Sequence, residues 1–323
     1  KCAKKENTVK ITKCRGCFSE EIETVIDLGV QPWGNDFRHK DFKGVIPTYP
    51  LAIDFCHRCA LLSLNYTVPK EVMFSDHTYL SGVTKTLTDY FHETSLESLK
   101  ILSDGRRKQS KKIKVLDIGS NDGAQLEQFK RLGCEVMGVE SSHNIAIIAQ
   151  NKGIPTINAY FNNALVESID ERFDLINASG VFFHLEELHS AIKAIKRLLL
   201  EKGLFVVQFI YLKKLIENGC FDQIHHEHLV YYLFTTLNGL LEPYGLEIFD
   251  GELKDIHGGS GVAYIGYQGK RKISTRLLNL YAEEKDCGFL TIEIYQRFMA
   301  DIEIFKRENR EYIEKQISKG KVI

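Results

Sequence analysis

The stretch that decides the fold is residues 115–123, VLDIGSNDG, where an apolar run ends at a glycine-bearing turn. A glycine in such a turn lets a ligand approach backbone amides that a side chain would otherwise shield. The spacing differs from the three-glycine fingerprint of dinucleotide-binding proteins. We therefore predict a strand that runs into a ligand-binding turn and then a helix.

Strand-like and helical patterns alternate on either side of this turn. This alternation is typical of an α/β fold, in which helices cover both faces of a parallel sheet. Two late runs with only a loop between them predict an antiparallel pair that closes the sheet edge. The strands are expected at 113–118, 135–139, 173–177, 204–210, 246–249 and 262–267, and the helices at 124–132 and about 185–200. Helical spacing also runs through residues 69–103, where one broad face can be shared by Leu87, Tyr90, Phe91, Leu96 and Leu99.

An acidic residue follows the turn at an informative distance. Glu140 ends the next predicted strand, about 20 residues beyond the glycine turn, and Ser141 comes directly after it. A carboxylate at this place can accept hydrogen bonds from both hydroxyls of a ribose. The turn and the acid together favour a nucleoside-containing cofactor. A nicotinamide enzyme or a purely structural sheet are the alternatives.

Four of the eight cysteines form two close pairs, Cys14-Arg15-Gly16-Cys17 and Cys56-His57-Arg58-Cys59. Each spacing lets one tight turn present two sulfurs to the same ion, and four thiolates at tetrahedral corners describe a structural zinc site. The alternative is two buried or redox-active cysteine pairs. The surrounding segment looks too small to form a hydrophobic core of its own, so metal binding should be coupled to its folding.

Charge and hydropathy restrict the partners. The 42 basic and 43 acidic side chains nearly cancel, which argues against a nucleic-acid or anionic-membrane partner. We find no apolar run long enough to span a bilayer and no secretory signal, so a cytoplasmic protein is expected. At 323 residues the chain is expected to hold two domains and a tail.

With these features in place, the chain resembles the zinc-containing nucleotide-sugar C-methyltransferases, the family typified by the C-3'-methyltransferase of tetronitrose biosynthesis. The resemblance runs from about Cys14 to Ile323. It is carried by separated landmarks in the same order, namely Cys14-x-x-Cys17, residues 27–32 (DLGVQP) with Asn35, Cys56-x-x-Cys59, Tyr79-Leu80-Ser81, residues 118–123 (IGSNDG), residues 221–229 (FDQIHHEHL) and residues 257–260 (HGGS).

The resemblance implies a class I methyltransferase sheet with an N-terminal zinc-binding domain and a C-terminal helical extension. The expected boundaries are 1–68 for the zinc-binding domain, 69–110 for a helical bridge and linker, 111–270 for the methyltransferase domain, and 271–323 for the helical start of a domain that the chain cuts short. The cofactors would be S-adenosylmethionine and a structural Zn²⁺. The cofactor would contact Asp117, Gly119, Ser120, Asn121, Glu140, Ser141, Asn177, Ala178 and Ser179.

Members of this family remove a proton from the carbon beside a sugar ketone and methylate that carbon. Such a proton is only weakly acidic, so the reaction requires a positioned base and a group that stabilises the enolate oxygen. By resemblance, His228 is the candidate base, with Glu227 and His225 beside it. A carboxylate next to an imidazole can fix its tautomer and raise its basicity. The expected partner is a nucleotide-linked keto-sugar, bound by Tyr79, His77, Ser81, Gln208 and His257.

Three features depart from the family pattern. His225 and His77 stand where the family commonly has tyrosine, and Gly261-Val262 replaces a frequent Leu-Arg pair. These changes leave open which carbon is methylated. His226 is expected to satisfy core hydrogen bonds, and His184 to divide between cofactor contact and packing.

The histidines and the glutamate at residues 225–228 are also compatible with a second metal site. The alternative functions are those of an O- or N-methyltransferase and of a non-catalytic scaffold that binds zinc and S-adenosylmethionine.

Overall fold

The structure is a computed structural model that describes residues 9–35, 37–74, 78–103 and 111–322. The expected substrate residue His77 and most of the expected linker, residues 104–110, lie outside the described residues. No helix in the described ranges combines the length and the apolarity needed to cross a membrane.

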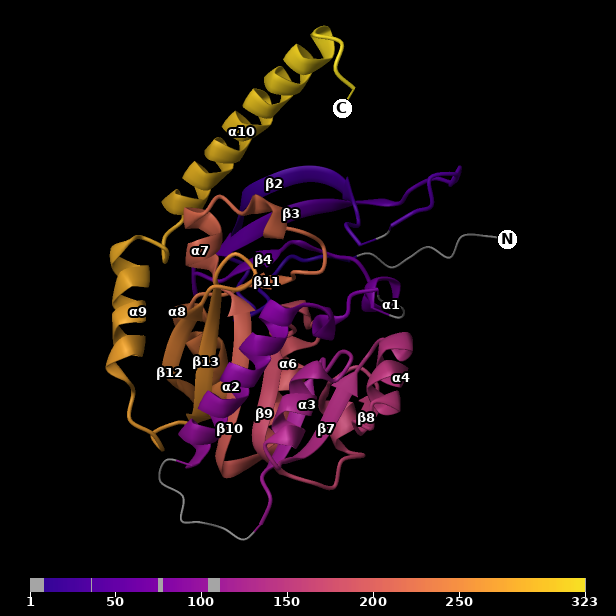
Figure 1. The fold of residues 1–323 in the computed structure, drawn as a ribbon. Helices are drawn as coiled ribbons and strands as arrows, with labels where there is room; N and C mark the ends of the chain where they lie inside the picture. The colour runs from indigo at the N-terminus through magenta and orange to yellow at the C-terminus, as the bar shows by residue number, and fades with distance from the viewer. Residues whose placement is uncertain (1–8, 36, 75–77, 104–110, 323) are drawn as a thin grey trace.

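A central sheet organises the larger part of the described chain, in the strand order β12-β13-β10-β9-β6-β7-β8 (Figure 1). Strands β6 to β10 pair in parallel, whereas β13 runs antiparallel to both β10 and β12, as the sequence predicted. Strand β6 pairs with β7 on one side and β9 on the other, a switch point that opens a crevice at the carboxyl ends of the strands. The strands are β6 (Lys114–Ile118), β7 (Glu135–Glu140), β8 (Thr156–Asn158), β9 (Phe173–Ser179), β10 (Leu199–Ile210), β12 (Leu246–Lys254) and β13 (Ser260–Tyr267).

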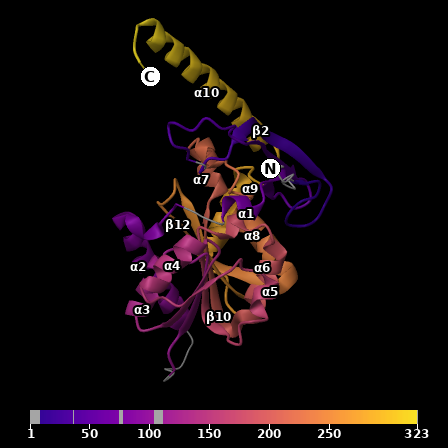
Figure 2. The same ribbon diagram turned by 90° about the vertical axis from the view of Figure 1, so that its right-hand side faces the viewer.

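Both faces of this sheet are apolar, because successive strand residues point to opposite sides. Val115 joins one buried cluster and its neighbour Leu116 joins another, and Leu175 and Ile176 divide in the same way. Figure 2 shows the helices on the two sides of the sheet. One face carries α2 (Lys85–Ser103), α3 (Ala124–Arg131) and α4 (His143–Asn151), and the other carries α5 (Asn163–Val166), α6 (Leu188–Leu198) and α8 (Phe234–Leu241).

Helix α2 turns a different face inward from the one its apolar residues predict. Leu96 is 45% exposed, although it was expected to share the buried face with Leu87 and Phe91. The buried stripe follows i, i+4 spacing from Leu87 and Tyr90, which brings the polar residues Thr94, Ser95 and Ser98 against the domain. The prediction of a helix is confirmed, but the prediction of which face it buries was partly wrong.

A second sheet, here called the N-terminal sheet, has the order β11-β4-β3-β2. Its strands are β2 (Ile22–Pro32), β3 (Thr48–Cys56), β4 (Leu62–Leu64) and β11 (Val230–Tyr231). Strand β11 comes from far along the chain and pairs antiparallel with β4. The side chains of this sheet belong to the same buried cluster as residues 229–234, so the N-terminal segment shares its core with the larger domain instead of standing alone.

The remaining elements are short connections and a C-terminal helical pair. Helix α10 extends away from the body, and its buried residues Tyr295, Phe298 and Ile302 lie in its first half, which packs against β2 (Figure 1). These elements are β1 (Val9–Lys10), β5 (Tyr66–Thr67), α1 (Lys70–Met73), η1 (Ser81–Val83), η2 (Phe182–His184), α7 (Leu212–Glu217), η3 (Phe221–Gln223), η4 (Glu242–Tyr244), α9 (Thr275–Asp286) and α10 (Glu293–Ser318).

A buried carboxylate fastens α9 to the sheet domain. Glu284 is fully buried and accepts hydrogen bonds from the Tyr211 hydroxyl, at 3.0 Å, and from the backbone N–H of Phe234, at 2.7 Å. The backbone N–H and the hydroxyl of Thr235 also donate to it, at 2.9 and 2.6 Å. The carboxylate thus satisfies backbone donors in the first turn of α8, which have no partner within the helix.

We predict that Glu284→Ala lowers the free energy of unfolding by about 3 kcal/mol, because it strands several buried donors at once. Glu284→Gln keeps one acceptor oxygen and should cost less. The matched control Glu283→Ala removes a side chain that is 57% exposed and should stay within about 0.5 kcal/mol of the parent. Urea unfolding measures all three, and equal losses for Glu284→Ala and Glu283→Ala would contradict this role.

Candidate active site

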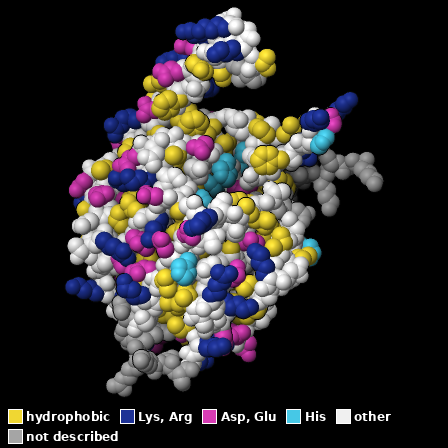
Figure 3. All heavy atoms as spheres, in the orientation of Figure 1, with side chains coloured by type: hydrophobic (Ala, Val, Ile, Leu, Met, Phe, Trp, Pro, Cys, Tyr) yellow, Lys and Arg dark blue, Asp and Glu magenta, His cyan; other side chains and the backbone are white. Residues whose placement is uncertain are grey.

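A cavity of about 370 Å³ lies at the carboxyl ends of the parallel strands. Residues at the carboxyl ends of β6, β7, β9 and β10 line it, together with His225, Glu227 and His228. Tyr79 and Ser81 also line it, next to the loop after β6, to which they are hydrogen-bonded. Histidine side chains gather in a recess of the face shown in Figure 3. The cavity is therefore the place where most of the predicted site residues can meet.

The cofactor loop, residues 119–123, follows β6 and has the conformation that its glycines predict. Gly119 and Gly123 have positive φ angles of 65° and 79°. A Cβ at Gly119 would come within 2.6 Å of Val181, so glycine is required there by space as well as by conformation. The backbone N–H groups of Gly119 and Ser120 donate to the Val139 carbonyl, which ties the loop to β7.

Glu140 ends β7 beneath this loop and lines the cavity. Its two carboxylate oxygens accept one backbone N–H each, from Asn121 at 3.0 Å and from Ser142 at 2.7 Å. Each oxygen can accept more than one hydrogen bond, so capacity remains for two ribose hydroxyls. The expected neighbours Ser120, Asn121 and Ser141 also line the cavity.

The fourth parallel strand contributes differently from what we predicted. Asn177 and Ala178 are fully buried in the sheet and lie outside the cavity wall, which is formed by Ser179, Gly180 and Val181. The Asn177 amide donates to Asp117 at 2.7 Å. Burial raises the pKa of Asp117 to about 7, although the bond from Asn177 opposes that shift. Asn177 therefore supports a residue of the wall and does not form the wall itself.

Backbone hydrogen bonds within the His loop, defined here as residues 225–228, and directly after it fix its conformation. The N–H of His228 donates to the His225 carbonyl at 3.0 Å, and the next N–H, that of Leu229, donates to the Phe183 carbonyl. The Nδ1 of His228 lies 2.7 Å from the Gln223 carbonyl oxygen. A carbonyl can only accept, so Nδ1 carries the proton and Nε2 carries the lone pair.

Glu227 has a different partner from the one expected. We predicted that its carboxylate would orient a neighbouring imidazole, but the Gln223 carbonyl does this for His228. The Glu227 carboxylate instead accepts from the Trp33 indole at 2.8 Å and from the Asn35 amide at 2.5 Å. Both donors follow β2, so the N-terminal segment holds the His loop.

The surroundings of three imidazoles that line the cavity favour their uncharged form. Burial, together with the nearby rings of His225 and His184, holds the pKa of His228 well below its usual range. Burial also lowers the pKa of His225 and of His257, and the charge of Glu227 partly opposes this at His225. An uncharged imidazole is the form that can accept a proton.

The other expected residues divide between the cavity and the core. Tyr79, Ser81, Gln208 and His257 line the cavity. His184 also lines it, and its Nδ1 lies 2.6 Å from the Glu227 carbonyl. His226 is buried against Tyr49 with its Nε2 3.2 Å from that residue's carbonyl oxygen, as its predicted core role requires.

Several wall residues were not predicted, among them Lys70, Phe74, Phe91, Gln125 and Tyr160. Helical spacing marked Phe91 as buried, but nothing in the sequence indicates that its helix lies over the cavity. The carboxylate support from Trp33 had one available signal, because this residue directly follows the landmark at residues 27–32.

The four paired cysteines converge, and their ligand atoms all lie within 4.8 Å of one another. The sulfurs of Cys14 and Cys59 are 3.6 Å apart, and those of Cys17 and Cys56 are 3.5 Å apart. A tetrahedral zinc–thiolate site with bonds of about 2.3 Å requires edges of about 3.8 Å. The donor set and its size therefore fit one tetrahedral metal ion.

The surroundings of this cluster favour a thiolate at Cys14, whereas burial raises the pKa of Cys56 to about 11 and the hydrogen bond with Cys14 raises that of Cys59. The hydrogen bond from Cys59 lowers the pKa of Cys14 to about 5, and burial opposes the shift. The backbone N–H groups of Gly16 and Cys17 also point at the Cys14 sulfur. Within the described residues, these cysteines form the only such cluster of possible metal ligands, which leaves the alternative of a second metal site at residues 225–228 without support.

The strand order, the glycine loop after the first parallel strand and the acid at the end of the second define a class I S-adenosylmethionine-dependent methyltransferase.

Three family models match the chain in sequence order. They are described as "Putative zinc binding domain" (residues 14–74), "Methyltransferase domain" (residues 87–250) and "C-methyltransferase C-terminal domain" (residues 255–323). The C-methyltransferase NovU of Streptomyces niveus is 30% identical over 322 residues, which cover 97% of this chain and 74% of NovU. The chain therefore belongs to the class I C-methyltransferase family that this three-part arrangement defines.

Two more distant proteins are similar to parts of the chain. A ubiquinone biosynthesis O-methyltransferase of Rhodopseudomonas palustris (strain TIE-1) is 33% identical over 98 residues, covering 29% of this chain and 39% of that protein. The solved structure of magnesium protoporphyrin IX methyltransferase from Synechocystis PCC 6803 with bound SAM is 14% identical, with a TM-score of 0.42, and the match covers 58% of this chain and 85% of that chain.

We predict that Gly138→Ala weakens binding of S-adenosylhomocysteine about tenfold, an energy of about 1.4 kcal/mol. A Cβ there would lie 2.4 Å from the Ser120 hydroxyl oxygen and 2.8 Å from its Cβ, so the cofactor loop would have to move. Gly239→Ala is the matched control, because nothing lies within 4 Å of its added Cβ. Isothermal titration measures both, and unchanged affinity in Gly138→Ala would contradict the assigned loop.

Proposed function

We propose that this C-methyltransferase methylates a carbon beside the ketone of a nucleotide-linked keto-sugar. The observation that carries the proposal is one cavity lined both by the cofactor loop with Glu140 and by the uncharged imidazole of His228. S-adenosylmethionine supplies an electrophilic methyl group when bound. The family resemblance supports the choice of a keto-sugar, and the name of NovU supports carbon as the acceptor.

The residues of the cofactor side would have separate tasks. Glu140 would accept the two ribose hydroxyls, because each of its oxygens accepts one backbone N–H and keeps capacity for a further hydrogen bond. The backbone of Gly119 and Ser120 would contact the methionine moiety, since the loop brings main-chain atoms to the wall. Ser179 would stand nearby at the end of β9.

The acceptor side would provide the base. Nε2 of His228 would take the proton from the carbon beside the ketone, leaving an enolate whose carbon then receives the methyl group. The hydrogen bond from Nδ1 to the Gln223 carbonyl would stabilise the resulting imidazolium, because a carbonyl dipole favours a charged donor. The low pKa of His228 keeps the base ready at neutral pH, and burial limits how long the ring holds the proton.

Neighbouring side chains would hold the sugar and the enolate oxygen. His225 lies beside His228, with ring centroids 3.7 Å apart, and would donate a hydrogen bond to the developing oxyanion. Tyr79, Ser81, Gln208 and His257 offer polar groups for sugar hydroxyls. Glu227 would position the loop, since Trp33 and Asn35 hold its carboxylate.

We also propose that the four-cysteine cluster holds a structural Zn²⁺. Four sulfur ligands leave no open position for substrate, so the ion would organise the fold and take no part in the reaction. The turn carrying Cys14 and Cys17 leads into β2, and the turn carrying Cys56 and Cys59 joins β3 to β4. The ion would therefore support the N-terminal sheet to which β11 is paired.

Proton exchange tests the carbon chemistry. The protein is incubated in deuterated water with S-adenosylhomocysteine and a panel of 3-keto and 4-keto hexose nucleotides, and deuterium at the carbon beside the ketone is measured by mass spectrometry. We expect exchange by the parent and a loss of at least about 100-fold in His228→Asn, the usual contribution of a general base. The matched control His92→Asn changes an exposed histidine on α2 and should retain exchange.

Other outcomes would reject the proposal in different ways. A product methylated on oxygen or nitrogen, formed without exchange, would show the alternative methyltransferase class. Tight binding of S-adenosylmethionine with no product from any sugar would favour the non-catalytic scaffold.

Metal analysis tests the zinc site. We expect about one zinc per chain in the purified protein, a large loss of metal in Cys17→Ser, and lowered thermal stability because the sheet loses its crosslink. Cys287→Ser is the matched control, since Cys287 is exposed and lies outside the cluster. Full stability of a metal-free Cys17→Ser protein would contradict a structural role.

A further inference from the structure

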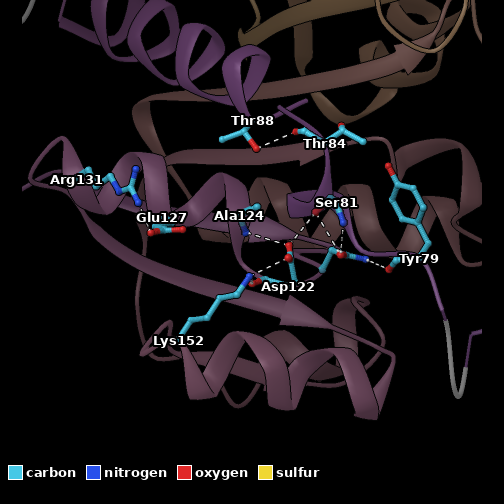
Figure 4. Close-up of polar contacts among 10 residues, drawn as sticks. Tyr79, Ser81, Thr84, Thr88, Asp122, Ala124, Glu127, Arg131 and Lys152 are labelled. Atoms are coloured by element: carbon cyan, nitrogen blue, oxygen red, sulfur yellow. Dashed lines mark hydrogen bonds and ion pairs between the residues drawn. The ribbon is translucent and has the colours of Figure 1, made fainter. Parts of the chain in front are cut away.

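Asn121 lies between the cofactor loop and a strap, defined here as residues 79–83, that reaches the cavity from before α2. Its side-chain oxygen accepts from the Ser81 N–H at 2.9 Å and from the Ser81 hydroxyl at 3.2 Å. Its side-chain N–H donates to the Tyr79 carbonyl at 3.1 Å. Figure 4 labels the two strap residues, Tyr79 and Ser81, and marks with dashed lines the hydrogen bonds that reach them.

The backbone of Asn121 is in a conformation that most side chains avoid. Its φ is +48°, in the left-handed region where a residue with a Cβ costs about 1–2 kcal/mol relative to the usual conformation. Glycine would adopt this φ without strain but could form none of the bonds to the strap. The amide side chain, which both donates and accepts, offsets the strain by bonding to the strap backbone.

Asp122 adds further contacts between the cofactor loop and the strap. One of its oxygens lies 3.1 Å from the Ser81 hydroxyl, whose single proton it shares with the Asn121 oxygen, and a Cβ on Gly82 would come within 2.6 Å of its other oxygen. On the side away from the strap, Asp122 pairs with Lys152 at 2.8 Å (Figure 4). The cofactor loop is therefore held by Lys152 on one side and contacts the strap on the other.

The backbone of Asn121 faces the cofactor side. Its N–H donates to Glu140 at 3.0 Å, the carboxylate assigned to the ribose. One residue thus bonds to the carboxylate of the cofactor site through its main chain and to the strap through its side chain. The strap brings Tyr79 and Ser81 to the wall of the cavity on the side assigned to the sugar.

We propose that Asn121 is a positioning residue that couples cofactor binding to the placement of the strap over the cavity. This proposal rests on the proposed function in placing the sugar beside Tyr79 and Ser81. A cofactor that binds Glu140 and the cofactor loop stabilises the loop conformation from which the strap is held. By linkage, the acceptor then binds more tightly after the cofactor than before it.

Hydrogen exchange of the full chain tests the coupling without any sugar. Amide exchange of peptides that cover residues 78–84 is followed by mass spectrometry, with and without saturating S-adenosylhomocysteine. In the parent, we expect the ligand to slow exchange of the strap at least about fivefold, the lower end of common coupling energies. In Asn121→Gly, which keeps the backbone conformation and the N–H to Glu140, the ligand should still bind, but the strap should not respond.

A matched variant separates coupling from general damage. Asn158→Ala removes another asparagine amide beside Glu140, whose side-chain N–H donates to the Glu140 backbone carbonyl and not to the strap. At saturating ligand, this variant should keep the response of the strap. Asn121→Asp retains the acceptor for Ser81 and should restore part of the response.

Two results would overturn the proposal, namely a parent strap that does not respond to bound ligand, or a full response in Asn121→Gly. Because no sugar is used, these results are distinct from failure of the keto-sugar assignment, which the exchange of carbon-bound hydrogen tests.

Discussion

The pairing of β11 with β4 is the constraint on which the candidate active site depends. Val230 pairs with Ser63 and Tyr231 with Leu62, which joins the chain directly after the His loop to the N-terminal sheet. The loop therefore cannot move independently of that sheet. Trp33 and Asn35 add a second attachment through Glu227. The N-terminal segment, which looks like a separate metal-binding module in the sequence, forms part of the support for the proposed base.

The central sheet provides the opposite wall by a different principle. Its parallel strands end together at the switch point beside β6, where the cofactor loop and Glu140 come from neighbouring strands. This side depends on backbone geometry, as the required glycine at 119 and the close approach at 138 illustrate. The cavity thus combines a wall of main-chain groups from one sheet with imidazoles held by the other, and methyl transfer to carbon needs both an activated methyl group and a base.

Much of this arrangement was predictable because it is encoded locally. The strands around residues 115–123, the late antiparallel pair and the two cysteine pairs each have a short-range pattern that sequence alone reveals. The partner of Glu227 was not predictable in this way, because Trp33 and Glu227 are far apart in the chain and meet only through the pairing of β11. The exclusion of Asn177 from the cavity wall also depends on tertiary structure, since its amide bonds to Asp117 on the adjacent strand. The buried face of α2 was missed because polar residues fill it.

The most direct test of this account is the titration of His228 by NMR, in protein with its metal bound and after the metal is removed, with the resonance assigned from His228→Asn. We expect His228 to stay uncharged well below pH 6.5 in the intact protein, because burial of the loop disfavours the charged form. Removing the metal should loosen the N-terminal sheet and return the pKa of His228 toward its usual value. A pKa that is already ordinary in the intact protein, or that is unchanged when the metal is lost, would contradict the claim that this sheet holds the base in place.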